Sequence, residues 1–246
     1  MSRPVLERTP VVAKIERRLF LRQSLSLGAL TLLSGCDISN HNSVQTVLKA
    51  ISSWNDRAQA FLFSRQTLAP TFAESDVVRD FRFHAYFPED DAPQLSAADY
   101  RLESSGLIAD KRPWSVEQLY ALPQESQITR HVCVEGWSMI GKWSGPRLGD
   151  FLQRVGADLT AKYVGFECAD GYYTSIDMPS ALHPQTIMAV KFADETLPAR
   201  YGYPFKIRIP TKLGFKNPKW VTTIFVTNRY PGGFWADRGY NWFSGS

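Results

Sequence analysis

One short stretch of the chain, residues 129–138, carries a thiol where a soft metal could be held. Four residues alternate along it and predict a strand with one shared face: Ile128, Arg130, Val132 and Val134. Cys133 then points to the opposite face, and Gly136 breaks the strand and lets another backbone approach closely. A thiol in such a place suits a soft metal or a reactive centre. The alternative is a buried apolar cysteine, which a lone thiol does not exclude.

The cysteine count offers a test of that metal site. The chain has three cysteines, Cys36, Cys133 and Cys168. If Cys36 is modified, the other two could form a disulfide in an oxidising compartment. A chain of this size can build a sufficient core without one. A Cys133–Cys168 disulfide would exclude Cys133 as a metal ligand.

Two further segments carry residues suited to binding a ligand. Residues 80–88 are rich in aromatics and contain three candidate contacts: Arg82, His84 and Tyr86. The alternative for His84 is a hydrogen-bonded core histidine. In residues 205–220, Lys206 and Arg208 share one face of a predicted strand, and a glycine-containing loop with three lysines follows. Such a loop suits phosphate; a solvated basic loop is the alternative.

The first 36 residues have the composition of an export signal. Arg17-Arg18 precedes an apolar run, Leu25–Leu33, which is well short of the ~20 residues that span a bilayer. The arginine pair is typical of a twin-arginine signal, with an ordinary secretion signal as the alternative. Small residues before Cys36 are typical of a lipidation site, so we expect a periplasmic protein, either anchored to the inner membrane through Cys36 or soluble after cleavage.

The charge balance argues against a nucleic-acid partner. The chain has 28 Lys and Arg residues and 24 Asp and Glu residues. Six of the basic and two of the acidic residues lie in residues 1–36, so the remainder carries 22 charges of each sign. The chain has no Walker-type phosphate loop, dinucleotide glycine fingerprint or zinc-type Cys/His cluster.

Hydrophobic periodicity and turn residues predict an α+β fold of mixed β-sheets flanked by helices. The predicted helices cover residues 43–63, 115–122, 147–155 and 178–183. We interpret residues 43–63 as a packing element in preference to a membrane-lying helix, because basic residues are sparse on its polar face. The predicted strands cover residues 100–108, 128–133, 163–168, 172–176, 186–192, 205–210 and 221–226. An aromatic tail at residues 231–243 is expected to cover the rim of a cleft.

Four motifs together resemble the molybdopterin-binding domain of the sulfite oxidase family: residues 130–138, 168–172, 201–210 and 216–220. The similarity runs from about Phe81 to the end. It is strongest to the small exported members, which include the catalytic subunit of periplasmic protein-methionine-sulfoxide reductase. The resemblance implies a sulfite-oxidase-type fold and a molybdenum–molybdopterin cofactor. Since the chain ends at Ser246, we expect no C-terminal immunoglobulin-like domain and no haem domain.

The resemblance also implies site residues. Cys133 matches the family's molybdenum ligand, and Arg82, His84 and Tyr86 match its pterin-contacting loop. Tyr201 stands where the family usually has His or Asn, and Lys206 stands where it usually has Arg. Lys206 keeps the positive charge of the arginine but cannot form its two parallel hydrogen bonds. The loop expected to wrap the cofactor contributes three more residues: Lys216, Asn217 and Lys219.

The implied function is oxygen-atom transfer, with reduction of an S-oxide-type substrate by electrons from a separate partner such as a cytochrome. The implied domains are a signal at 1–36, a helix and connection at 37–79 and a catalytic domain at 80–246. One alternative is a sulfite dehydrogenase, which needs cations at the metal, for which Arg82, Arg130 and Lys142 are candidates. The other is a non-catalytic exported lipoprotein that kept the fold as a binding module.

Overall fold

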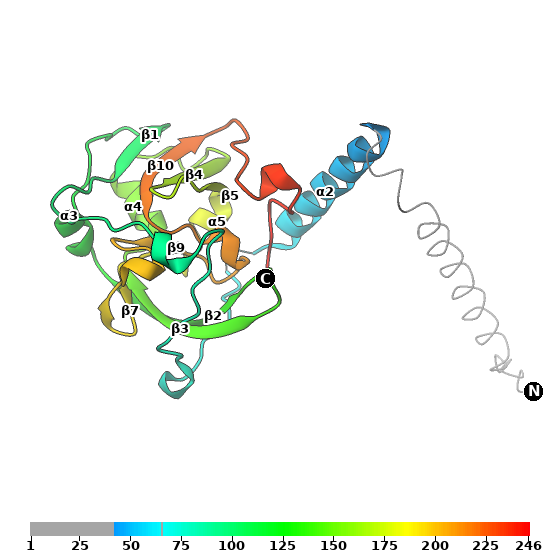
Figure 1. Ribbon diagram of the computed structural model, residues 1–246. Helices are drawn as coiled ribbons and strands as arrows, with labels where there is room; N and C mark the ends of the chain where they lie inside the picture. The colour runs from blue at the N-terminus through cyan, green and yellow to red at the C-terminus, as the bar shows by residue number, and fades with distance from the viewer. Residues whose placement is uncertain (1–41, 65) are drawn as a thin grey trace, which may run out of the picture. The chain divides into compact units, whose positions relative to one another are not determined.

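The computed structural model describes residues 42–64 and 66–246. The predicted signal and the predicted lipidation at Cys36 lie outside these residues. The chain divides into two compact units, Met1–Ser52 and Ser53–Ser246, and every strand among the described residues belongs to the second (Figure 1). No helix among the described residues is long and apolar enough to cross a membrane.

Helix α2 (Asn42–Leu62) forms where hydrophobic periodicity predicts it, but it does not pack as predicted. Its apolar side chains are exposed, with Trp54 at 65% and Phe61 at 87% of their full accessible area. The polar residues Asp56 and Gln59 make hydrogen bonds to the C-terminal segment instead. The prediction of a helix packed through its apolar face is therefore wrong.

The larger core lies against a four-stranded sheet with the order β1-β10-β4-β5. Its strands are β1 (Glu103–Gly106), β10 (Val221–Thr227), β4 (Tyr163–Cys168) and β5 (Tyr173–Asp177). Only the β1–β10 pair is parallel. A tight turn connects β4 to β5, with Gly171 at φ +76° and the Tyr172 N–H donating to Asp170 Oδ1.

A second sheet carries the hairpin that contains Cys133, with the order β2-β3-β7-β8. Its strands are β2 (Glu125–Val132), β3 (Ser138–Gly145), β7 (Lys191–Phe192) and β8 (Glu195–Thr196). Strand β3 was not predicted. The strand predicted at 186–192 is interrupted at Val190, because its first part, β6 (Ile187–Ala189), pairs with β9 (Lys206–Arg208) while β7 pairs with β3.

Short helices connect these sheets. The α-helices are α3 (Val116–Tyr120), α4 (Leu148–Arg154) and α5 (Met178–Ala181). Single 3₁₀ turns are η1 (Glu74–Asp76), η2 (Glu89–Asp91), η3 (Ala199–Tyr201), η4 (Gly214–Lys216) and η5 (Ala236–Arg238). A capping box opens α3: the side chains of Ser115 and Gln118 each accept a hydrogen bond from the other residue's backbone N–H.

A smaller aromatic core packs against the β2–β3 hairpin. Phe81 lies at its centre and contacts the rings of Trp143, Phe192 and Tyr201 edge-on. The ring of His131 on β2 contacts Phe81 from the same side. This cluster therefore fixes the end of β2, where Cys133 follows.

Candidate active site

Cys133 lies at the tip of the β2–β3 hairpin. Strand β2 ends at Val132, the Cys133 N–H donates to the Trp137 carbonyl at 2.9 Å, and the Gly136 N–H donates to the Cys133 carbonyl at 3.1 Å. Gly136 has φ +88°, which glycine adopts without the strain a side chain would cause. The turn holds the thiol in a fixed position, 8% exposed, in the wall of a pocket.

The surroundings of Cys133 favour the neutral form of its thiol. Burial raises the pKa of Cys133, and the Glu135 carboxylate raises it further. Glu135 Oε2 lies 3.9 Å from the Cys133 sulfur and also accepts a hydrogen bond from the Trp137 indole at 2.9 Å. A soft metal would displace the thiol proton on binding.

Cys133 does not form a disulfide. Cys133 and Cys168 are both free and buried. The disulfide alternative is therefore wrong, and the sulfur of Cys133 is available for another partner.

The pocket around Cys133 is built by segments that are far apart in the sequence. The 84–86 segment and the loop after β4 form two sides of it, and η4 with the residues after it forms a third. The lining residues with polar or reactive groups include His84, Tyr86, Cys133, Glu135, Asp170, Tyr172, Asn217 and Lys219. Trp235 and Tyr240 of the aromatic tail also line it, in agreement with the expected position of that tail at a cleft rim.

Behind the pocket lies a cluster of basic side chains. His131 is fully buried, its ring lies 4.6 Å from that of His84, and neither of its ring nitrogens has a partner among the described residues. Lys206 is also fully buried, and its Nζ contacts the Trp143 ring but has no acceptor among those residues. Burial, and then the positive charge of the neighbouring bases, lowers the pKa of both histidines and of Lys206 well below the ordinary values.

Lys219 joins this cluster to the pocket. Its Nζ donates to the His84 carbonyl at 2.7 Å and lies over the rings of Phe83 and Trp220. Burial lowers the pKa of Lys219 to about 7. A neighbouring anion would raise this pKa again and keep the ammonium group charged.

Arg208 and Asn217 fix the position of the cofactor loop relative to β2. Asn217 Oδ1 accepts hydrogen bonds from Arg208 Nη1 at 3.0 Å and from the Ile209 N–H at 2.7 Å. Arg208 Nη2 donates to the Arg130 carbonyl at 2.6 Å. These bonds connect the loop after β9 to the strand that ends at Cys133.

Gly214 lets this loop approach β2 closely. A Cβ at this position would lie 2.6 Å from His131 Nε2, well inside contact distance. The absence of a side chain therefore brings η4 directly against His131 and brings the residues after it to the pocket.

These residues fit an anionic organic cofactor that carries its own metal ligands. Buried basic groups without acceptors are costly unless an anion joins them, and Lys206 and His131 are such groups. The described residues contain no group of three or more His, Cys, Asp or Glu side chains that could hold a metal ion. A metal held at Cys133 would therefore need further ligands from the cofactor itself.

Four predicted site residues lie outside the pocket lining: Lys206, which belongs to the basic cluster, and Arg82, Tyr201 and Lys216. Arg82 stacks on Trp137, with its guanidinium carbon 5.3 Å from the ring centre. Tyr201 donates its hydroxyl to the Phe81 carbonyl at 2.7 Å within the smaller core. Lys216 is turned away and donates to the Ser175 carbonyl at 2.8 Å.

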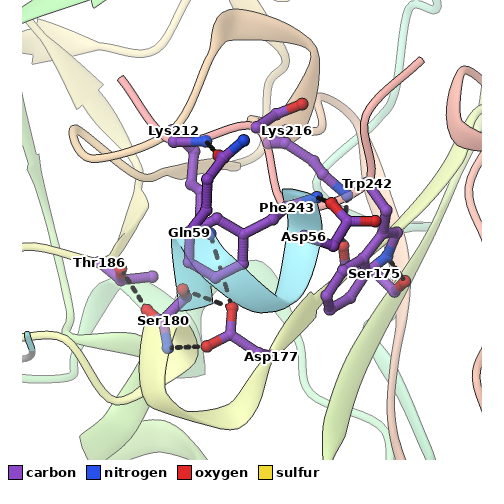
Figure 2. A network of polar contacts seen from close by, with 12 residues as sticks. Asp56, Gln59, Ser175, Asp177, Ser180, Thr186, Lys212, Lys216, Trp242 and Phe243 are labelled. Atoms are coloured by element: carbon purple, nitrogen blue, oxygen red, sulfur yellow. Dashed lines mark hydrogen bonds and ion pairs between the residues drawn. The ribbon is translucent and has the colours of Figure 1, made fainter. Parts of the chain in front are cut away.

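The three loop lysines do not form one phosphate cradle. Lys212 lies against the Phe243 ring and 3.6 Å from Asp177 Oδ1, and Lys216 lies against Trp242 (Figure 2). Only Lys219 reaches the pocket. The prediction of a shared cradle is therefore wrong, because the C-terminal segment covers the other two lysines.

The cations proposed for a sulfite site do not converge on Cys133. Lys142 is paired with Glu74 at 3.1 Å and with Asp194 at 2.7 Å. Arg130 lies over the Phe72 ring. Neither of these two residues lines the pocket.

Sequence reasoning gave no site role to His131, Asp170 and Tyr172, which lie at or behind the pocket. One signal could have found His131: it precedes Cys133 by two positions and so shares its face of the strand. Asp170 and Tyr172 stand out in the sequence only as a turn, and their place at the pocket depends on the pairing of β4 with β5.

The comparisons with known proteins agree with this site. A sequence model of the family described as "Oxidoreductase molybdopterin binding domain" matches residues 89–235. A putative protein-methionine-sulfoxide reductase subunit YedZ1 from Azospira oryzae is 56% identical over 230 residues, which cover 94% of this chain and 88% of that protein.

More distant relatives cover less of the chain. The protein-methionine-sulfoxide reductase catalytic subunit MsrP of Xanthomonas campestris is 32% identical over 166 residues, 61% of this chain and 52% of that protein. The chain thus matches about half the length of that relative. The sulfane dehydrogenase SoxCD of Paracoccus pantotrophus has the same fold, with a TM-score of 0.53 at 22% identity over 56% of this chain and 40% of that one.

The chain therefore belongs to the molybdopterin-binding oxidoreductases of the sulfite oxidase family. The motif resemblance, the α+β fold and the sulfite-oxidase-type fold that the resemblance implies are confirmed. The chain is an enzyme of that class, and its cofactor is of the molybdopterin type.

Proposed function

We propose that this protein is a periplasmic molybdenum–molybdopterin enzyme that reduces an S-oxide. The observation that carries the proposal is that the free thiol of Cys133 shares a pocket with Lys219, in front of the unpaired buried bases His131 and Lys206. A soft ligand and a cationic cradle are the two features that the cofactor needs from the protein.

In this proposal Cys133 is the protein ligand of molybdenum. Lys206 and Lys219 face the negative charge of the cofactor, and His84, Tyr86 and Asn217 contact its pterin. When bound, the cofactor supplies a metal centre that exchanges two electrons and one oxygen atom with the substrate. Arg82, Tyr201 and Lys216 act from outside the pocket, by packing.

The substrate side of the pocket suits a sulfoxide of a thioether. Reduction of a sulfoxide consumes two electrons and two protons and releases water, so the site needs a proton donor. Burial raises the pKa of Asp170, which keeps its carboxyl protonated to higher pH than usual. Tyr86 donates its hydroxyl to the Asp170 carbonyl at 2.5 Å and lies beside it at the rim. Phe215, Trp235 and Tyr240 provide an apolar wall for the thioether carbons.

The names of the relatives support methionine sulfoxide as the substrate class. They describe protein-methionine-sulfoxide reductase subunits. A subunit of a reductase implies a separate source of electrons, which we propose to be a cytochrome at the membrane. Export through the twin-arginine route would deliver the folded, loaded enzyme to the periplasm, with residues 80–246 as its catalytic domain and Cys36 as the point of lipid anchoring.

Activity assays separate this function from its alternatives. Purified enzyme with a reduced dye should reduce methionine sulfoxide, and Cys133→Ala should lose this activity. Turnover of sulfite with an electron acceptor, without sulfoxide reduction, would favour the sulfite dehydrogenase instead. Absence of molybdenum from protein made in a cofactor-competent host would favour the non-catalytic binding module.

A further inference from the structure

The carboxyl half of α2 turns its apolar side to the outside. Trp54, Phe61 and Leu62 are 65%, 87% and 79% exposed, although they lie on one face at helical spacing. An amphipathic helix of a globular protein ordinarily buries this face against its own core. Nothing in the part of the chain that the structure describes covers this apolar face, so its exposure requires another explanation.

Hydrogen bonds from the polar side fix this orientation. Asp56 Oδ1 accepts from the Phe243 N–H at 2.7 Å, and Gln59 Oε1 accepts from the Gly245 N–H at 3.1 Å. Gln59 Nε2 also donates to Asn241 Oδ1 at 3.3 Å. Figure 2 shows Asp56 and Gln59 on the cyan helix among the residues of this network. Rotation of the helix to bury Trp54 would break all three bonds.

The apolar face continues toward the start of the same helix. Val47, Leu48 and Ile51 are exposed, and they precede Trp54 by seven, six and three positions. Val47 and Ile51 therefore lie on the same side of the helix as Trp54, and Leu48 lies at the edge of this face. A face of this length along one helix is larger than the scattered exposed apolar residues of an ordinary surface.

The sequence before α2 indicates what covers this face. The apolar run Leu25–Leu33 and the lipidation-type Cys36 lie just upstream, and Cys36 is only six positions before Asn42. Six residues reach at most about 20 Å. A chain attached to a bilayer at Cys36 would therefore keep α2 within reach of the lipid surface.

The composition of the helix also suits a lipid surface. Trp54 lies in the apolar face, and tryptophan favours the boundary between lipid and water. The charged residues of α2 are only Lys49, Asp56 and Arg57, so anionic headgroups gain little from it. Binding would therefore depend on apolar burial, with little dependence on headgroup charge or salt.

We propose that α2 lies in the surface of the membrane, with the face from Val47 to Leu62 in the lipid and its polar side on the catalytic domain. The proposal uses the proposed location of the protein and is independent of its redox chemistry. The helix would hold the catalytic domain against the bilayer, beyond what a flexible lipid tether alone achieves.

Quenching of Trp54 fluorescence by lipid tests this proposal. The emission of Trp54 is the difference between the wild-type chain and Trp54→Phe, each bound to phosphatidylcholine vesicles with or without bromine on the acyl chains. We expect brominated lipid to lower this difference about twofold or more, because interfacial helices reach the acyl boundary. Ile51→Ser with Phe61→Ser should abolish the quenching, and Leu107→Ser, an exposed apolar residue on another element, should not.

Other results would overturn the proposal. Equal Trp54 emission with both lipids would show that the face does not enter lipid. A change of Trp54 emission with protein concentration in the absence of vesicles would indicate a second copy of the chain as the occupant. Quenching that requires anionic lipid would contradict an apolar mode of binding. Sulfoxide turnover, measured in parallel, reports separately on the proposed enzyme function.

Discussion

Lys206 is buried in a way that is unusual for a lysine, because its amine has no acceptor among the described residues. Its side chain is fully buried, and its Nζ lies over the Trp143 ring. The charged groups of Lys219 and Arg208 are close enough to lower its pKa. Such burial costs stability unless an anion compensates it. Strain of this kind at a binding site is relieved when the ligand arrives.

Lys206→Met should therefore separate stability from cofactor binding. In protein made without the cofactor, we expect the free energy of unfolding in denaturant to rise by about 1–2 kcal/mol, because a similar volume is kept and the buried amine is removed. In protein made with the cofactor, molybdenum content should fall.

Lys111→Met, at an exposed position, is the matched control and should change neither quantity. Two results together would contradict the role given to Lys206. One is a lower free energy of unfolding for the Lys206→Met protein made without the cofactor, and the other is a normal molybdenum content for the variant made with it.

At the scale of elements, the cofactor loop depends on one glycine. The ring of His131 cannot move away from a side chain at position 214, because it is buried against Phe81 and lies beside Trp137. Gly214 thus sets how closely η4 approaches β2.

Gly214→Ala should lower the free energy of unfolding by about 1–3 kcal/mol through overpacking, and it should lower cofactor content as well. Gly149→Ala is the control, since its Cβ would meet Leu182 only at 3.5 Å. It lies within α4 and should stabilise by about 0.5–1 kcal/mol. Equal effects of the two substitutions would contradict the close contact at His131.

The C-terminal segment covers two lysines that the pocket does not use. Lys212 and Lys216 are buried under Phe243 and Trp242, and burial lowers their pKa values to about 8 and about 7. Between such a value and the ordinary lysine pKa, the folded protein holds fewer protons than the unfolded chain. The free energy of unfolding therefore rises with pH in that window.

Lys216→Met tests this pH dependence. We expect its stability relative to the wild type to be greatest near pH 7 and to decrease as the pH rises toward 9, because the wild type no longer buries a full charge there. Denaturant unfolding at several pH values measures the difference, with Lys191→Met at an exposed site as control. A difference that stays constant across this range would show that Lys216 is not perturbed by burial.

Local patterns predicted most elements and less of their pairing. Strand β4 and its turn follow from the run Tyr163–Cys168 and Asp170-Gly171, and the capping box of α3 follows from Ser115 and Gln118. Strand β3 was not predicted. The single strand predicted at 186–192 is in fact two strands with different partners, since β6 pairs with β9 and β7 pairs with β3. Partner choice depends on contacts across the whole chain, which periodicity does not contain.

The same limit applies to the site. The proximity of Cys133 to Lys219 was expected through the family resemblance, and the structure places both in one pocket. The separation of Lys212 and Lys216 from that pocket was not predictable, because the C-terminal segment that covers them is distant in sequence. The outward orientation of the apolar face of α2 likewise depends on hydrogen bonds from its polar side to residues 241–245.

At the scale of the whole molecule, the pocket extends beyond the residues that the family model matches. The matched region covers residues 89–235, whereas His84 and Tyr86 lie before it and Tyr240 lies after it. These flanking segments close the pocket from two sides. They are the natural place to look for differences in substrate between this chain and its relatives.

The central claim is that Cys133 binds molybdenum through its sulfur, and X-ray absorption at the molybdenum edge tests it most directly. The measurement compares the loaded wild type with Cys133→Ser and counts the sulfur neighbours of the metal. We predict one sulfur fewer in the variant, with pterin content retained and sulfoxide reduction lost. An unchanged sulfur count in the metal-loaded variant would contradict the account.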